Sequence, residues 1–496
     1  MNTSPNWHAR ARALNPQRLA FVDGKFTAAT SGRTFDTISP IDGRVIASVA
    51  ACDSDDVDRT VAVARRSFED GRWSGAAPAH RKKVLTRLAE LIAAHADELA
   101  LLETIDVGKP IQDSIAVDVG ASARTMAWYG EAIDKVYGEI APTASGALGL
   151  ISREPIGVVA AVVPWNFPLL MAVWKVAPAL AAGNSMILKP AEQSPLTALK
   201  LAELAAAAGV PDGVLNVVPG YGETAGKAIG LHPDIDAVAF TGSTEVGKLF
   251  LRYASESNLK QVSLECGGKS PNIVCADCPD LDGAARAAAD AIFYNQGEVC
   301  SAGSRLLVDS RIRPEFLEKV AAHAGAMAPG DPLDPATRLG ALVSEEHMKR
   351  VLGFIEAGSA GGAQQIMGGR RVRQETGGFY IEPTIFAGVD PRSTIAQEEI
   401  FGPVLITCEF HSLEEAIAIA NQTRYGLAAG VWTSSLNTAH RLARAIRAGT
   451  VWINCYEASD VTVPFGGYKQ SGSGRDKSLH ALLKYTQLKT TWLNLQ

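Results

Sequence analysis

A chain of 496 residues is too long for one hydrophobic core, so two or three domains are expected. The net charge of −6 offers no basic surface for a phosphate backbone, which argues against nucleic acid as a partner. No run of eighteen apolar residues occurs, and the first residues lack an apolar signal core. We therefore expect a cytoplasmic protein that does not enter a membrane.

Seven cysteines, an odd number, and the lack of a secretion signal predict reduced thiols rather than a disulfide framework. Cys275 and Cys278 form a single CxxC pair. A structural zinc site needs two further ligands at matched spacing, and the sequence has no second pair. We expect no metal, and cysteines that belong to loops and core.

The first part of the chain is predicted to be largely helical. The segment that begins at Asp53 starts with acidic capping residues and places apolar residues on one helical face. Those residues are Val57, Val61, Ala64 and Phe68. Further helical patterns continue to about residue 135.

From residue 157 onwards, short apolar strands alternate with helical segments. The first series is GVVAAVVPWNFP, SMILKP, GVLNVVPG and DAVAFTGS. A second series after about residue 266 is PNIVCADC, SRLLVD, PTIFAGV, GPVLITCEF, GLAAGVWT and GTVWIN. Strands that alternate with helices predict parallel sheets that bind ligands at the carboxyl ends of their strands. The predicted fold class is therefore α/β, in two units.

Two of the strand ends carry residues suited to a nucleotide. In AFTGSTEVGK, Gly242, Ser243 and Gly247 lie where a strand gives way to a helix, so main-chain N–H groups can approach a phosphate. A plain helix cap would explain the same residues. In ILKPAEQSP, Lys189 and Glu192 can bind ribose hydroxyls, and the carboxylate would repel a 2′-phosphate. The alternative is a pair of solvated loop charges.

Three other segments carry groups typical of catalysis. Two prolines in PWNFP fix the main chain around Asn166, whose amide could then stabilise an oxyanion. Glu265 follows an apolar strand, where burial would raise its pKa towards that of a general base, although it could equally cap a turn. Cys300 in FYNQGEVCSAGSR lies between small residues, and a lone cysteine is more often an inert core residue.

Seven motifs occur in the order and spacing of the aldehyde dehydrogenase superfamily. They are PWNFP, KPAEQSP, FTGSTEVG, LECGGKSP, NQGEVCSAGSR, EEIFGPV and PFGGYKQSG. The chain resembles that family from about residue 20 to its end, and seven ordered motifs are far more specific than any single one. The resemblance implies a Rossmann-like nucleotide-binding domain, a second α/β catalytic domain and a β oligomerisation arm.

Matched position by position, the resemblance gives the three catalytic candidates their roles. Cys300 matches the nucleophile, Glu265 the general base, and Asn166 the oxyanion donor alongside the Cys300 main-chain N–H. The implied reaction is thiolate attack on an aldehyde to give a thiohemiacetal, followed by hydride transfer to a nicotinamide, which leaves a thioester. Glu265 would then activate water to release the acid.

The resemblance implies NAD as the cofactor, with NADP disfavoured by Glu192. The matched cofactor contacts around the adenosine and pyrophosphate are Trp165, Lys189, Glu192, Gly222, Gly242, Ser243 and Gly247. Glu399 and Phe401 match residues that hold the nicotinamide ribose and ring.

The sequence departs from the family pattern at three positions. Cys266 replaces a residue that is commonly leucine or alanine, and oxidation of this second thiol would inhibit. Asp476 matches a position often held by glutamate, which in the family can form a proton route with the lysine at Lys175. The shorter aspartate leaves that relay open. Val299 precedes the nucleophile where several relatives carry a cysteine.

The substrate tunnel of the family would be lined here by Phe167, Met171, Trp174 and Phe465. Glu457 and Asp460 would lie across its mouth with Asp118 facing them, and acidic residues there favour an aldehyde with a cationic far end. Ordinary rim charges are the alternative interpretation.

Two segments are most similar to the ω-aminoaldehyde branch of the family, which includes the γ-glutamyl-γ-aminobutyraldehyde and 4-guanidinobutyraldehyde dehydrogenases. They are SGSGRDKSLHALLKYTQLKT and GEAIDKVYGEIA. Simple aliphatic or aromatic aldehydes are the alternative substrates.

By the same resemblance, the nucleotide-binding domain takes residues 1–130 and 157–265, and the catalytic domain takes residues 266–458. The arm takes residues 131–156 and 480–496, and its strands would join copies of the chain into a homo-oligomer, either a dimer or a tetramer. The alternation in KTTWLNL supports an edge strand that awaits a partner.

Three other classes of protein are less consistent with these residues. A catalytically silent, nucleotide-binding structural protein would be expected to lose the thiol, the base or the amide, and all three are present. A thiol esterase would work without nucleotide, which leaves the cofactor motifs without a purpose. An acylating dehydrogenase would pass the thioester to coenzyme A and would not need Glu265 to activate water.

Overall fold

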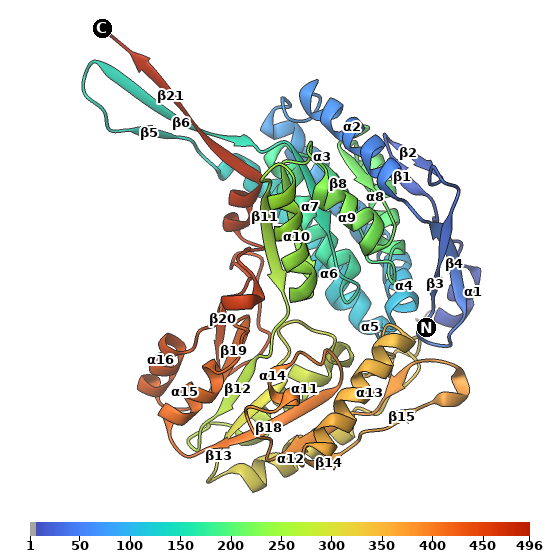
Figure 1. Cartoon of the computed structure of the whole chain (residues 1–496), viewed down its shortest axis with the longest axis vertical. Coiled ribbons are helices and arrows are strands. Elements are labelled where there is room, and N and C mark those ends of the chain that lie inside the picture. Colours follow the sequence, from blue (N-terminus) through green and yellow to red (C-terminus); the bar gives the residue numbers. More distant parts are fainter. Residues whose placement is uncertain (1–5) are drawn as a thin grey trace, which may run out of the picture.

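The computed structural model describes residues 6–496, which form two seven-stranded sheets with helices on both faces and a smaller projecting sheet (Figure 1). The first sheet has the strand order β11-β10-β7-β8-β9-β1-β2. Its strands are β1 (Ala20–Val22), β2 (Lys25–Thr27), β7 (Val158–Val162), β8 (Ser185–Lys189), β9 (Leu215–Val217), β10 (Ala237–Gly242) and β11 (Gln261–Cys266). The strands from β11 to β9 are parallel, and β1 and β2 pair antiparallel at one edge.

Helices cover both faces of this sheet, which explains why its central strands are apolar runs rather than alternating patterns. Along β7, Val158 and Ala160 belong to one buried cluster, whereas Val159 and Ala161 belong to the cluster on the other face. One face is covered by α2 (Ser54–Glu69), α9 (Lys227–Leu231) and α10 (Thr244–Glu256). The other is covered by α3 (Pro78–Ala94), α4 (Ala96–Val107), α6 (Gly120–Ala132), α7 (Pro168–Ala182) and α8 (Leu196–Ala208).

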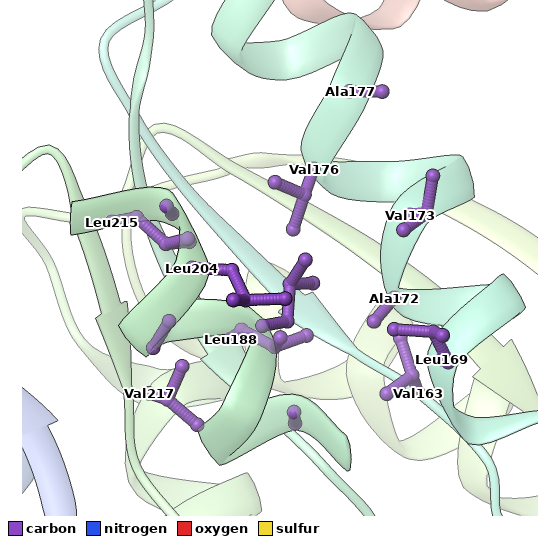
Figure 2. Close-up of a cluster of buried hydrophobic side chains, with 14 of the residues drawn as sticks. Val163, Leu169, Ala172, Val173, Val176, Ala177, Leu188, Leu204, Leu215 and Val217 are labelled. Atoms are coloured by element: carbon purple, nitrogen blue, oxygen red, sulfur yellow. The ribbon is translucent and has the colours of Figure 1, made fainter. Parts of the chain in front are cut away.

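Leu188 of β8 lies at the centre of the cluster on the face that α7 and α8 cover, between side chains of α7, α8 and β9 (Figure 2). It is fully buried, as are Val176 of α7 and Val217 of β9. This packing fixes α7 against the sheet, and α7 begins directly after the PWNFP turn. The core therefore holds that turn at the carboxyl end of β7.

The second sheet has the order β14-β17-β18-β13-β12-β19-β20 and is parallel except for the edge strand β14. Its strands are β12 (Pro271–Val274), β13 (Arg305–Asp309), β14 (Gln364–Met367), β17 (Thr384–Ala387), β18 (Val404–Phe410), β19 (Ala428–Trp432) and β20 (Thr450–Ile453). One buried cluster joins it to α11 (Leu281–Phe293) and α12 (Arg313–Gly325). The opposite cluster includes α13 (Glu345–Ala360), α15 (Leu413–Asn421) and α16 (Leu436–Ala445).

The third sheet projects from the body and contains the C-terminus (Figure 1). It consists of β5 (Glu139–Ala141), β6 (Ala147–Pro155) and β21 (Thr486–Asn494), all antiparallel, and we call it the arm. Its apolar side chains are largely exposed, among them Ile140 and Trp492.

The remaining elements are short. Hairpins or bridges are formed by β3 (Thr34–Ile38) with β4 (Val45–Ala50) and by β15 (Arg371–Val372) with β16 (Tyr380–Ile381). Among the short helices are α1 (Trp7–Ala13), α5 (Ile111–Asp113) and α14 (Thr394–Gln397), a π-helix η1 (Ser114–Val119) and the 3₁₀ turns η4 (Tyr294–Gly297) and η7 (Leu479–Tyr485).

The predicted α/β fold class is confirmed, and a strand lies within each of the ten predicted strand segments. The predicted helix after Asp53 is α2, where the Asp53 side chain caps the helix and Asp56 completes a capping box. The predicted domain boundaries at residues 130, 157 and 265 lie close to the ends of α6, β6 and β11. No helix between residues 6 and 496 combines the length and apolar character needed to cross a bilayer.

Candidate active site

A cavity of about 1110 Å³ is lined by residues of both α/β units. Most of the residues named from sequence as candidates lie in its wall. They are Trp165, Asn166, Phe167, Met171, Trp174, Gly242, Ser243, Glu265, Cys300, Glu399, Phe401, Glu457, Asp460 and Phe465. The structure therefore brings the three catalytic candidates, Asn166, Glu265 and Cys300, to one cavity from three separate segments of the chain.

Cys300 follows a tight turn at the end of α11. Asn295 and Gln296 adopt left-handed conformations with φ of 48° and 57°. Gly297 follows with φ of 75°, and a Cβ there would stand 2.1 Å from the carbonyl oxygen of Gly402. Only glycine allows this approach, which docks the turn against the strand β18 region. The turn delivers the half-buried Cys300 to the cavity.

The surroundings of Cys300 disfavour its thiolate form. Burial raises its pKa, and the negative charges of Glu457, Glu399 and Glu265 raise it further. A thiol is nucleophilic only as the thiolate, so this group needs a base or a nearby positive charge before it reacts.

Asn166 is buried and anchored at both its side chain and its main chain. Its Nδ2 donates to the carbonyl of Glu298 at 2.8 Å, and Asn295 Nδ2 donates to the Asn166 carbonyl at 3.2 Å. An amide nitrogen has two N–H groups, so the second remains free to donate to an oxygen in the cavity. The geometry gives Asn166 the fixed aim that an oxyanion donor requires.

Glu265 lies at the end of β11, is 3% exposed, and has no hydrogen-bond partner on either carboxylate oxygen among residues 6–496. Its Oε1 stands beside two glycines, because a Cβ on Gly466 or Gly474 would lie 2.6 or 2.9 Å away. Burial raises the pKa of Glu265 well above its usual value, Asp476 raises it further, and Lys175 and Lys484 act in the opposite direction. An unpartnered carboxylate with a raised pKa is suited to accept a proton.

Behind Glu265, Asp476 accepts hydrogen bonds from the ammonium groups of Lys175 and Lys484. All three side chains are buried. The two lysines keep Asp476 ionised, and the pKa of this carboxyl is lowered although burial alone would raise it. The shorter aspartate thus reaches Lys175 directly, and it has a second lysine that the sequence did not suggest.

Four candidate residues of the nucleotide region lie outside the cavity wall, around the carboxyl ends of β8, β9 and β10. Lys189 ends β8, where its buried Nζ donates to the Pro190 carbonyl at 3.0 Å and to Glu192 at 3.4 Å. Gly222 begins the turn after β9 and is exposed, with no atom within 4 Å of an added Cβ. Gly247 lies in the first turn of α10, where a Cβ would stand 2.9 Å from Cys266 Sγ.

These positions fit a dinucleotide. Ser243 is the exposed N-cap of the thirteen-residue helix α10, and helix N-termini favour phosphate. Beyond this phosphate position, the small Gly222 leaves room for a ribose, and the Lys189–Glu192 pair offers polar groups to bind it. Thr241 Oγ1, also in the cavity wall, is buried without a partner among the described residues.

At the other end of the nucleotide region, Glu399 and Phe401 line the same cavity as the catalytic candidates. Glu399 Oε1 accepts from the Gly268 N–H at 3.0 Å, and burial raises its pKa to about 7. Phe401 and Trp165 stand edge to face with ring centroids 5.2 Å apart. The pair forms an aromatic wall beside Glu399, of a size and polarity suited to a nicotinamide riboside.

The proposed substrate wall is aromatic. The rings of Trp174 and Phe465 lie 5.5 Å apart, and the ammonium of Lys109 stands 3.7 Å from the centre of the Phe167 ring. Glu457 accepts a 2.6 Å hydrogen bond from Ser301 Oγ, so its carboxylate is tied to the loop that carries the thiol.

The expectation that Asp118 faces the cavity mouth is wrong. Asp118 is fully buried in the π-helix η1 and does not line the cavity. Its Oδ1 accepts a 2.7 Å hydrogen bond from Lys109, which is equally buried. Within the π-helix this side chain forms an ion pair with Lys109, so the carboxylate already has a partner within the protein.

Sequence reasoning missed four charged or titratable residues near the cavity: Arg124, His347, Lys477 and Lys484. Arg124 and Lys477 line the cavity with Asp460, so its entrance carries both signs of charge rather than only the acidic one expected. Their positions in the chain gave no signal, because α6 and the segment around residue 460 meet only in the folded protein. A polar lysine among apolar neighbours in LHALLKY was the one available hint for Lys484.

No cluster of three or more potential metal ligands occurs within residues 6–496. The groups that the site does combine are a thiol, a buried amide, an unpartnered carboxylate and a dinucleotide-sized cleft between two α/β units.

This fold and site define an aldehyde dehydrogenase. The model of the aldehyde dehydrogenase family matches residues 26–491, and the chain belongs to that family. The family and the fold expected from the seven motifs are confirmed.

Particular relatives are similar over almost their whole length. The chain is 54% identical to the NADP/NAD-dependent aldehyde dehydrogenase PuuC of Escherichia coli K12, covering 99% of this chain and 98% of that protein. It is 58% identical, with a TM-score of 0.98, to AldA indole-3-acetaldehyde dehydrogenase of P. syringae, whose structure contains NAD+ and IAA; 99% of each chain is covered. It is 59% identical, with a TM-score of 0.97, to γ-glutamyl-γ-aminobutyraldehyde dehydrogenase of Burkholderia cenocepacia J2315, again over 99% of each chain.

Proposed function

We propose that this protein is an NAD-dependent dehydrogenase that oxidises aldehydes with an amino-substituted far end to carboxylic acids. The observation that carries the proposal is the convergence of Cys300, Asn166 and Glu265 on one cavity that also contains Glu399 and Phe401. A nucleophile, an oxyanion donor and a base in one place, next to a dinucleotide cleft, are the parts that this reaction needs.

In the proposed mechanism, the Cys300 thiol first releases its proton to water in the cavity. The thiolate then attacks the aldehyde carbon, and the Asn166 amide donates to the oxygen that becomes negative. NAD+, when bound, supplies the acceptor for the hydride that leaves the thiohemiacetal carbon. The acyl group then remains on Cys300 as a thioester. Glu265 takes a proton from water, the resulting hydroxide attacks the thioester, and the carboxylic acid leaves.

Under this proposal the protein binds NAD+ through the residues predicted for it. Glu399 would hold the nicotinamide ribose, Phe401 and Trp165 would flank the ring, and Lys189 with Glu192 would bind the adenosine ribose. Glu192 favours NAD over NADP because its carboxylate would repel a 2′-phosphate. Two relatives support a nicotinamide dinucleotide as the cofactor, since one is described as NADP/NAD-dependent and the structure of another contains NAD+.

An amino-substituted aldehyde is favoured by the acidic residues Glu457 and Asp460 at the cavity entrance and by the 59% identical enzyme named for γ-glutamyl-γ-aminobutyraldehyde. Aromatic aldehydes are the second candidate, because the cavity wall carries Phe167, Trp174 and Phe465 and a 58% identical relative is an indole-3-acetaldehyde dehydrogenase.

We further propose a cytoplasmic homo-oligomer, a dimer or tetramer, in which residues 1–130 and 157–265 bind the nucleotide and residues 266–458 supply the thiol. The exposed apolar residues of the arm, such as Ile140 and Trp492, support its role in joining copies of the chain.

NADH formation with a panel of aldehydes of matched length tests the proposal. The panel contains 4-aminobutyraldehyde, its γ-glutamyl and guanidino counterparts, butyraldehyde and benzaldehyde. We expect the amino-substituted aldehydes to exceed the others at least tenfold in kcat/KM, about 1.4 kcal/mol. Cys300→Ala should abolish turnover while NAD+ still binds, and turnover by that variant would contradict the proposed mechanism.

A further inference from the structure

The entrance of the active-site cavity carries an arginine without a partner. Arg124 on α6 is exposed and lines the cavity. Among residues 6–496, no hydrogen bond, ion pair or aromatic ring engages its guanidinium. By contrast, Arg338 in the same wall is paired with Asp290 at 2.8 Å. The guanidinium of Arg124 is therefore free to bind an anion that enters the cavity.

A second positive charge lies on the same side. Lys477 also lines the cavity, and its ammonium donates to Ser459 Oγ and stands 5.5 Å from the centre of the Trp174 ring. Trp174 packs against Phe465, so this ammonium lies where the aromatic wall ends. Two cations at this entrance would attract a carboxylate at the far end of a substrate, which the acidic residues of the wall would not do.

An available carboxylate lies close to these cations. Asp460 is exposed, and its Oδ1 accepts from the N–H and hydroxyl of Thr462 at 2.8 and 2.6 Å, which leaves Oδ2 free. The hydrogen bonds from Thr462 lower the pKa of Asp460, and the positive charges of Lys477 and Arg124 lower it further. Asp460 thus stays ionised near Arg124, yet the two do not form an ion pair with each other.

Part of the cavity wall is apolar. Phe167, Met171, Trp174 and Phe465 line the same cavity as Cys300, Arg124 and Asp460. A substrate with its aldehyde at Cys300 and its other end at Arg124 and Asp460 would pack its connecting chain against these side chains.

We propose that the far end of the preferred substrate carries both a carboxylate and an ammonium, as an amino acid does, with the carboxylate on Arg124 and the ammonium on Asp460. Guanidinium binds carboxylate through two parallel N–H donors, so Arg124 selects for that group in a way that a point charge would not. A γ-glutamylamino aldehyde has such an end, whereas 4-aminobutyraldehyde has only the ammonium. This inference rests on the proposed aldehyde dehydrogenase activity and specifies its substrate class.

Four aldehydes test it with the purified full-length protein. They are 4-(γ-glutamylamino)butyraldehyde, its analogue without the α-carboxylate (4-aminobutanoylamino), its analogue without the α-ammonium (glutarylamino), and butyraldehyde. We expect each deletion of a charged group to lower kcat/KM about tenfold from that of the γ-glutamyl compound. Equal values for the γ-glutamyl compound and the analogue without the carboxylate would overturn the inference.

Two variants assign the charges. Arg124→Gln should lower, about tenfold, the ratio of kcat/KM for the γ-glutamyl compound to that for the analogue without the carboxylate. Asp460→Asn should lower, about tenfold, the ratio of kcat/KM for the γ-glutamyl compound to that for the analogue without the ammonium. Arg338→Gln removes the same charge from the same cavity wall, but from a guanidinium already paired, and should keep both ratios. If Arg338→Gln shifts them as much as Arg124→Gln does, general electrostatics explains the effect and the inference fails.

The design separates the two levels of the hypothesis. If wild-type protein oxidises none of the four aldehydes, the proposed function is wrong. If it oxidises butyraldehyde and the γ-glutamyl compound with equal kcat/KM, aldehyde oxidation stands and the recognition of an amino-acid end is wrong.

Discussion

His347 Nε2 donates a 2.6 Å hydrogen bond to the main-chain carbonyl of Phe401. A carbonyl only accepts, so the proton must lie on Nε2, and burial lowers the pKa of His347 to about 4, which keeps the ring neutral. Phe401 has φ of 61°, a conformation that bulky residues rarely adopt. The ring of His347 also packs on Trp165, with centroids 5.1 Å apart. The histidine therefore holds Phe401 in an unfavourable main-chain conformation beside the catalytic groups.

We predict that His347→Leu raises the KM for NAD+ about tenfold, the effect expected from one lost hydrogen bond of about 1.4 kcal/mol. The KM for aldehyde should change much less, because the contact supports only the aromatic wall at Phe401. His347→Gln, which keeps a donor, should recover part of the affinity. Steady-state kinetics with each substrate varied in turn measures the split, and equal effects on both KM values would point to general damage.

Glu265→Gln should separate the two halves of the reaction. The amide cannot accept a proton from water, so thioester hydrolysis should slow by about 10²–10⁴-fold. Formation of the first equivalent of NADH does not need this base and should persist as a burst. Rapid-mixing measurement of NADH followed by its steady-state rate distinguishes the phases, and loss of the burst would show that Glu265 acts earlier.

Lys484 should set the pH at which the base works. Deacylation requires ionised Glu265, so its rate falls as the pH drops through the raised pKa of that group. The positive charge of Lys484 lowers this pKa, and its removal must therefore raise it. We expect Lys484→Met to move the acid limb of the steady-state profile to higher pH. Lys484→Arg keeps the charge and should leave the limb near its wild-type position; identical profiles for the Met and Arg variants would contradict the prediction.

Leu188→Ala should destabilise the protein by about 2–5 kcal/mol, because Leu188 is fully buried where β8 meets α7 and α8 (Figure 2). Leu436 on α16 is 71% exposed, so Leu436→Ala is the matched control and should change stability by less than about 0.5 kcal/mol. Denaturant unfolding compares the two variants. Equal losses would mean that the cluster around Leu188 relaxes to fill the cavity.

The parts of this protein that depend on local sequence could be predicted. The strands are apolar runs between turns, and Cys300, Glu265 and Asn166 lie in motifs whose order alone identifies the family. Asp118 was misplaced because the turn of η1 that directs it inwards is an irregularity that no periodic pattern encodes. Arg124 was missed because its importance depends on which residues do not pair with it, and only the folded chain determines that.

The arm has a consequence for the synthesis of the protein. Within the arm, Ser152 of β6 lies against Lys489 of β21, and 337 residues separate them in the chain. Ribosomes add about 5–20 residues per second, so β6 leaves the ribosome on the order of 20–70 s before its partner. Until then β5 covers three positions of one edge, and the other edge is open. A nascent chain thus displays an unpaired strand while most of the body is still being synthesised, and crowded polysomes would be the setting in which this protein is most prone to associate wrongly.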